Sequence, residues 1–208
     1  MSSRARGGLE GWSVAGWIVA GLALVTVLQI AVVGTGEEGA RLVVRTTGRV
    51  STALFAAAFS ASALVALHRS PLTAWLRRNR RALGVSFAGS QTIHLLGLAA
   101  LARSAAFRQA VDLPTLLVGG IAFVFTYAMA ATSSDAAVRQ LGRSWRWLHR
   151  VGGWWIFVVL IVTEAPKAFA GPAQAVLSAA LVTTLALRIV AWRRRPGSLR
   201  LDASPGFR

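Results

Sequence analysis

Six apolar runs, each close to the length of a membrane-crossing helix, constrain this chain more than any other feature. A hydrocarbon core of ~30 Å takes about 20 helical residues at ~1.5 Å each. The runs cover residues 12–33, 50–67, 83–101, 113–131, 147–165 and 172–192. The first four contain no Asp, Glu, Lys or Arg, and the last two need Arg150 and Arg188 to reach toward an interface. These lengths predict an all-α, polytopic membrane protein with six transmembrane helices.

The charge of the chain points to lipid. The 208 residues are 55% hydrophobic and carry a net charge of +16, with the arginines in short clusters between the apolar runs. Such clusters are typical of membrane-interface anchors, which bind anionic headgroups, so we expect membrane lipid and no nucleic acid as a partner. The chain has no cysteine, so any metal must be held by nitrogen or oxygen ligands.

The distribution of Lys and Arg predicts the orientation. An inward-facing N-terminus places 16 Lys and Arg on inner segments and 6 on outer ones, with Arg188 inside a span. We therefore expect both termini in the cytoplasm and a multi-pass protein of a bacterial-type inner membrane. Residues 1–192 would form one transmembrane domain, whose first run stays in place as a helix, and residues 193–208 a short basic tail. No glycine-rich phosphate loop follows a strand, so we expect no nucleotide-binding domain in this sequence.

Three histidines are the candidate metal ligands. His94 lies in the middle of the third run, on a helix face shared with Gly84, Phe87, Gln91 and Leu98. A polar side chain in hydrocarbon is costly, so this face should point into the bundle. His94 is then either a buried histidine bonded to Gln91 or to a neighbouring helix, or an axial haem ligand.

His149 and His68 both lie near the inner surface. His149 lies near the inner end of the fifth run among four tryptophans and precedes Gly152 and Gly153, so it is either an interfacial histidine or a ligand beside a flat ring. His68 borders the basic loop and is either solvated or a further ligand. Two axial nitrogens on one haem lie only about 4 Å apart, whereas His94 and His149 differ in depth by more than ~10 Å. The sequence predicts that these two do not share one iron, and leaves open an inner pair of His149 with His68.

Three segments resemble a known family. "RRALGVSFAGSQTIH" (80–94), "TTGRVSTALFA" (46–56) and "TSSDAAVRQLGRSWRWLHRV" (132–151) are similar to ferric reductase-like transmembrane domains, above all to the haem-binding membrane subunits that serve periplasmic methionine sulfoxide reductase. The resemblance covers about residues 46–151. It implies a six-helix bundle that binds b-type haem through His94 and His149 and passes electrons from an inner donor, a redox protein or quinol, to an outer acceptor.

The chain departs from this pattern at one position. The family has another histidine 13 or 14 residues after the one in "LHR", where this chain has Val162 and Thr163, followed by Glu164. Two functions therefore stay open: a haem electron-transfer subunit, with His68 as a possible extra ligand, or a haem-free relative that acts as a membrane scaffold or partner subunit. A transporter is disfavoured because polar residues in the spans are scattered. No hydrolytic constellation is present, so if the chain is an enzyme its chemistry is redox.

Overall fold

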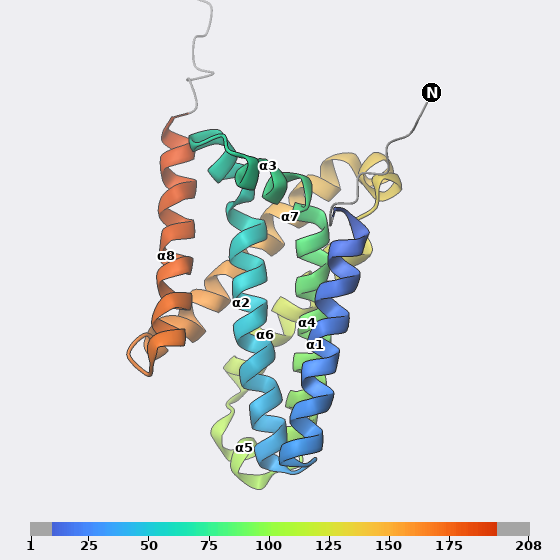
Figure 1. The fold of residues 1–208 in the computed structure, drawn as a ribbon, viewed down its shortest axis with the longest axis vertical. Coiled ribbons are helices and arrows are strands. Elements are labelled where there is room, and N and C mark those ends of the chain that lie inside the picture. Colours follow the sequence, from blue (N-terminus) through green and yellow to red (C-terminus); the bar gives the residue numbers. More distant parts are fainter. Residues whose placement is uncertain (1–9, 195–208) are drawn as a thin grey trace, which may run out of the picture.

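The computed structural model describes residues 10–194 as a bundle of α-helices (Figure 1). Within that range, six helices are long and apolar enough to cross a membrane. They are α1 (Trp12–Val33), α2 (Glu37–Leu67), α4 (Arg80–Leu101), α6 (Leu113–Ala131), α7 (Asp135–Glu164) and α8 (Pro172–Arg193). Two short helices, α3 (Pro71–Arg78) and α5 (Ala105–Ala110), and one 3-10 turn, η1 (Ala165–Lys167), lie in the connections. The predicted all-α, six-helix fold is confirmed, and the chain is a multi-pass membrane protein.

Two helices extend well beyond the apolar runs that predict them. α2 begins at Glu37 and α7 at Asp135, where the apolar runs start only at 50 and 147. In α2 the added turns carry acidic residues at the helix N-terminus, where they complement the helix dipole. In α7 the Ser134 side chain caps the N-terminus by accepting from the Ala137 amide at 3.1 Å, and Gly142, at φ 48°, bends the helix between its polar and apolar parts. The predicted tail 193–208 lies outside the described residues from 195 onward.

α2 is the central helix of the bundle. It packs most extensively on α4 and then on α8, while α7 packs on α6. A cluster of aromatic and aliphatic side chains fills the centre, where the Phe59 ring stacks on Phe55 at 5.1 Å and on Phe157 at 5.4 Å between ring centroids. Small residues let the helices approach, as Gly152 and Gly153 do in α7, both of which are buried.

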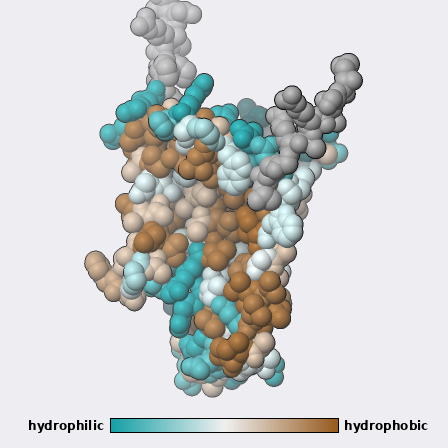
Figure 2. Space-filling view, in the orientation of Figure 1, coloured by the Kyte–Doolittle hydropathy of each residue, from teal (hydrophilic) through white to brown (hydrophobic). Residues whose placement is uncertain are grey.

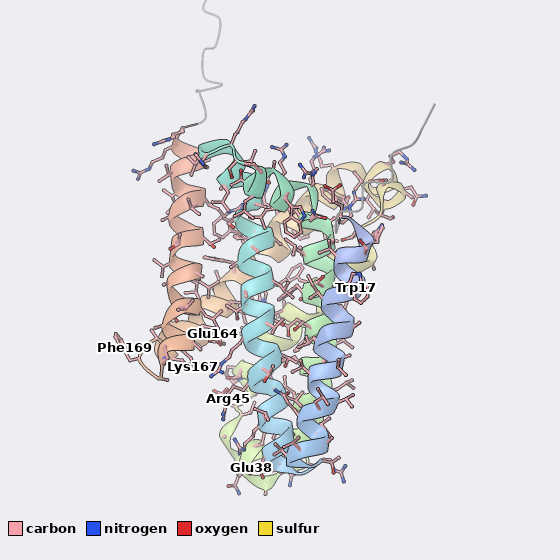
Figure 3. All side chains as sticks on the ribbon, viewed as in Figure 1. Trp17, Glu38, Arg45, Glu164, Lys167 and Phe169 are labelled. Atoms are coloured by element: carbon pink, nitrogen blue, oxygen red, sulfur yellow. The ribbon has the colours of Figure 1, made fainter. Side chains whose placement is uncertain are left out.

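The two ends of the bundle differ in charge. We call one the arginine-rich end: it holds α3, the starts of α4 and α7, and the end of α8. The opposite end holds α5 and the α1–α2 turn. Hydrophobic residues cover much of the face between the hydrophilic ends (Figure 2). The α7–α8 turn stops well short of the opposite end (Figure 1), and Phe169 at its tip points away from the bundle, fully exposed (Figure 3). The α1–α2–α4 side of the bundle therefore reaches further at the opposite end.

Candidate functional site

A cavity of about 690 Å³ opens among α2, α4, α6 and α7 at the arginine-rich end. This volume falls within the ~300–1,000 Å³ that small-molecule sites occupy. Phe55, Phe59, Phe87 and Ile156 form its apolar wall. Gly84 also lines it, and a Cβ at that position would meet nothing within 4 Å. The inner part of the cavity is therefore apolar, with open space beside α4.

Arginines surround the rest of this cavity. Of the described residues that line it, seven are arginines: Arg77, Arg78, Arg80, Arg81, Arg146, Arg150 and Arg188. Two form ion pairs at the rim, Arg78 with Glu10 at 3.2 Å and Arg81 with Asp135 at 2.7 Å. The positive charge exceeds the negative charge around the cavity, so the arrangement favours a ligand with anionic groups.

Arg188 enters the cavity from α8. Its guanidinium donates to the Phe59 carbonyl oxygen at 2.8 Å and lies 3.8 Å from the centroid of the Phe59 ring. Both contacts suit a cation held away from bulk water. The sequence predicts only that Arg188 reaches toward a membrane interface. Its site role was missed because the apolar pattern of α8 does not indicate which face meets α2.

His149 lines the cavity from α7 and is half-buried. Its Nδ1 lies 3.1 Å from the Trp145 carbonyl oxygen, and its ring stacks on the Trp145 indole at 4.1 Å. The Met129 carbonyl also interacts with the ring. A neutral imidazole has one N–H, so donation from Nδ1 to Trp145 leaves Nε2 as an acceptor or metal ligand. The indole of Trp145 in turn donates to the Thr132 carbonyl at 2.9 Å, which holds the stacking partner in place.

His94 lies elsewhere, on the face of α4 that packs against α2. It is half-buried, and its Nδ1 is 2.9 Å from the Thr47 hydroxyl oxygen. It is not among the described residues that line the cavity. Arg80 acts electrostatically on His149 and starts α4, whereas His94 follows 14 residues later, about 21 Å along the helix. The structure therefore places His94 and His149 at different levels.

The surroundings of His94 include charged side chains from the end of α7 and from η1. Lys167 and Glu164 form an ion pair at 3.1 Å, and the charges of both act on the His94 ring. Figure 3 shows Glu164, Lys167 and Arg45 on the same side of α2. Val162 is 64% exposed, so it faces outward from the bundle. The residue two positions further on, Glu164, is the one whose side chain turns inward, at 13% exposure.

His68 caps the C-terminus of α2 and is exposed. Its amide donates to the Leu64 carbonyl at 2.8 Å, and its carbonyl accepts from the Thr73 hydroxyl at 2.9 Å. It is absent from the described lining of the cavity. Within residues 10–194, no three His, Asp or Glu side chains gather in a group that could hold a metal ion. A metal here would need a ligand set completed by a cofactor.

Together, the fold and the cavity define a polytopic helical membrane protein with an arginine-lined internal site and a histidine in its wall. Comparison with known proteins gives relatives named protein-methionine-sulfoxide reductase heme-binding subunit MsrQ. The protein from Ralstonia nicotianae is 34% identical over 147 residues, which cover 66% of this chain and 65% of that protein. The protein from Yersinia pseudotuberculosis is 31% identical over 155 residues, which cover 72% and 73%. The Yersinia pestis protein is also 31% identical over 155 residues, covering 72% of each chain.

This chain belongs to the MsrQ family. The match spans about two thirds of the Ralstonia relative's length. No protein-family model matches the chain, and no solved structure matches it.

Proposed function

We propose that this chain is a haem-binding electron-transfer subunit of a membrane redox system. The observation that carries the proposal is the cavity in which one imidazole, an apolar wall and a ring of arginines come together. The heme-binding relatives support the same reading. The proposed cofactor is b-type haem, held by side-chain ligands without a covalent thioether link, because the chain has no cysteine.

The residues of the cavity fit such a group. A haem is a flat, largely apolar ring with two carboxylates on one edge. The wall of Phe55, Phe59 and Phe87 would pack on its faces, His149 Nε2 would bind the iron, and the arginines would pair with its carboxylates. When bound, haem supplies a one-electron couple between ferrous and ferric iron. The Trp145 carbonyl would keep the His149 ring oriented by accepting its Nδ1–H.

His94 would hold iron at a second level, nearer the opposite end. The two histidines differ in depth by more than ~10 Å, so electrons would cross the membrane in two steps instead of one. At the position of the absent histidine the chain has Val162 or Thr163, neither of which carries an imidazole. Val162 also faces outward, and the Thr163 hydroxyl donates to the Val159 carbonyl at 2.8 Å. We propose that His94 is the only histidine at this level. His68, exposed at the end of α2, remains a predicted further ligand.

The proposed direction of electron flow follows the charge asymmetry. Lys and Arg number 16 on the segments that the sequence assigns to the inner side and 6 on those that it assigns to the outer side. This bias favours an inner-membrane protein with the arginine-rich end and both termini in the cytoplasm. The loop from Arg69 to Arg81 would then face a cytoplasmic redox protein or a quinol donor, and the acceptor would lie on the outer side.

A second candidate function is a haem-free membrane scaffold or partner subunit. Val162 favours this function, because it stands where the family has a histidine, has no side-chain atom that could bind iron and faces outward.

Spectroscopy of the purified protein separates the two functions. The measurement is a reduced-minus-oxidised visible spectrum with a haem-to-protein ratio, compared with His94→Ala, His149→Ala and His68→Ala. A stoichiometric b-type spectrum that weakens in His149→Ala or His94→Ala supports electron transfer and identifies the level that holds haem. A folded protein that stays colourless after haem is supplied during expression contradicts electron transfer and supports the scaffold.

A further inference from the structure

The segment "TTGR" at residues 46–49 brings one hydroxyl group directly to a histidine of the neighbouring helix. Thr47 lies in α2 with no exposed surface. Its Oγ1 is 2.9 Å from Nδ1 of His94 in α4. The next residue, Gly48, lies close to the same ring, with its missing Cβ at 3.5 Å from the His94 Cε1 atom. The imidazole of His94 therefore contacts one turn of α2 through Thr47 and Gly48.

The Thr47 hydroxyl donates its proton to the backbone of its own helix. The hydroxyl donates to the Val43 carbonyl at 2.7 Å, with the Val44 carbonyl as a longer alternative at 3.2 Å. A hydroxyl has one proton and two acceptor lone pairs. With its proton on Val43, Oγ1 can only accept from His94, so Nδ1 must carry the hydrogen.

A second set of hydrogen bonds holds α2 and α4 in register at this point. The Ser90 hydroxyl of α4 donates to the Thr47 carbonyl at 3.2 Å and accepts from the Ser51 hydroxyl of α2 at 2.8 Å. Ser51 and Ser90 are at most 1% exposed, so water does not compete for these groups. Because the two helices are pinned one turn away, the Thr47 oxygen and the His94 ring cannot easily slide apart.

We propose that Thr47 is a positioning residue for His94, which fixes the ring as its Nδ1–H tautomer and leaves Nε2 as its one ligand atom. The part of this inference that concerns iron rests on the proposed function. A hydrogen bond from the non-ligating nitrogen orients a metal-binding imidazole and makes it a stronger donor. Such a donor stabilises ferric iron more than ferrous iron, so Thr47 would lower the reduction potential at the His94 level.

The tautomer can be measured without haem. The full-length protein, labelled with ¹⁵N-histidine, has three imidazoles, which His→Ala variants assign. In the wild type, the ¹⁵N shifts of His94 should show hydrogen on Nδ1. Thr47→Val keeps the side-chain shape but removes the acceptor, so hydrogen should move to Nε2, whereas Thr47→Ser should retain the wild-type pattern.

Thr52→Val is the matched control. Thr52 is equally buried in α2 and donates to the Gly48 carbonyl at 3.0 Å, and no hydrogen bond of its side chain to a histidine is found among the described residues. This variant should leave the His94 tautomer unchanged, which separates the loss of the specific acceptor from a general loss of packing. A wild-type His94 with hydrogen on Nε2, or a Thr47→Val spectrum identical to wild type, overturns the inference.

Haem titration and redox potentiometry test the consequence for iron. Thr47→Val should weaken haem binding at the His94 level by about 10–100-fold and raise the midpoint potential, while Thr47→Ser and Thr52→Val stay near wild type. Unchanged affinity and potential in Thr47→Val would overturn the role of Thr47 toward iron and leave haem binding intact. If the wild type binds no haem, the proposed function fails, and the tautomer measurement alone decides whether Thr47 positions His94.

Discussion

Replacing Gly152 with alanine tests how tightly α6 and α7 pack beside the cavity. A Cβ at this position would lie 2.8 Å from the Met129 sulfur, 2.9 Å from Phe125 Cδ1 and 3.2 Å from Phe125 Cβ. The sulfur belongs to a flexible side chain and can move, but the ring of Phe125 is stiffer and packs against the central core. Relief therefore requires a shift of α6 relative to α7.

The expected cost follows from two opposing terms. Overpacking of a well-filled interface costs about 1–3 kcal/mol, while Gly→Ala inside a helix gains up to about 1 kcal/mol in intrinsic propensity. Gly120→Ala in α6 provides the matched reference, because its Cβ would meet nothing within 4 Å. The propensity gain is common to both variants and cancels in their difference. We expect Gly152→Ala to be less stable than Gly120→Ala by about 1–3 kcal/mol.

The assay is reversible unfolding of the purified protein by SDS in mixed micelles, followed by the fluorescence of its eight tryptophans. Wild type, Gly152→Ala and Gly120→Ala are compared at the same detergent concentration. Equal stability of the two variants, or a more stable Gly152→Ala, would refute the claim that α6 and α7 are in close contact at Gly152.

Three further substitutions test other contacts. Gly84→Leu should fill the open space beside α4 and remove haem from the His149 level with little loss of stability, as seen by haem titration and SDS unfolding; undiminished haem binding would contradict that location. Arg188→Met should destabilise the bundle by about 1.5–3 kcal/mol, since it removes a charged hydrogen bond to Phe59, and an unchanged unfolding midpoint would argue against that bond. Asn79→Ala should cost about 0.5–1.5 kcal/mol because it removes the 2.7 Å hydrogen bond that the Gly11 amide donates to the buried Asn79 side chain; an Asn79→Ala protein as stable as wild type would count against it.

The number and order of the spanning helices could be predicted because hydropathy depends on composition and length alone. The starts of α2 and α7 could not be predicted in this way, because their outer turns are charged and lie beyond the apolar run. A signal was present in α2, where Arg41, Arg45 and Arg49 recur every four residues on one helix face. Such spacing indicates that a helix continues even where its hydropathy falls.

The sequence indicates which residue types belong to the candidate site, but not which residues they contact. The three histidines and the depth difference between His94 and His149 follow from sequence positions. That His94 bonds to Thr47, instead of to Gln91 on its own helix, depends on how α4 is rotated about its axis against α2. The same rotational freedom hid the approach of Arg188 to Phe59, which are 129 residues apart.

The short α7–α8 turn leaves the bundle with a step in its outline. α8 has 22 residues and α2 has 31, so the helices are about 33 Å and 46 Å long. A bilayer that matches α8 leaves roughly two turns of α2 standing above its surface, including Arg41. In such a bilayer the headgroups on the α8 side would lie level with the charged pair Glu164 and Lys167, well short of the α1–α2 turn. The His94 ring, on which the charges of that pair act, would thus lie close to the membrane surface on the α8 side.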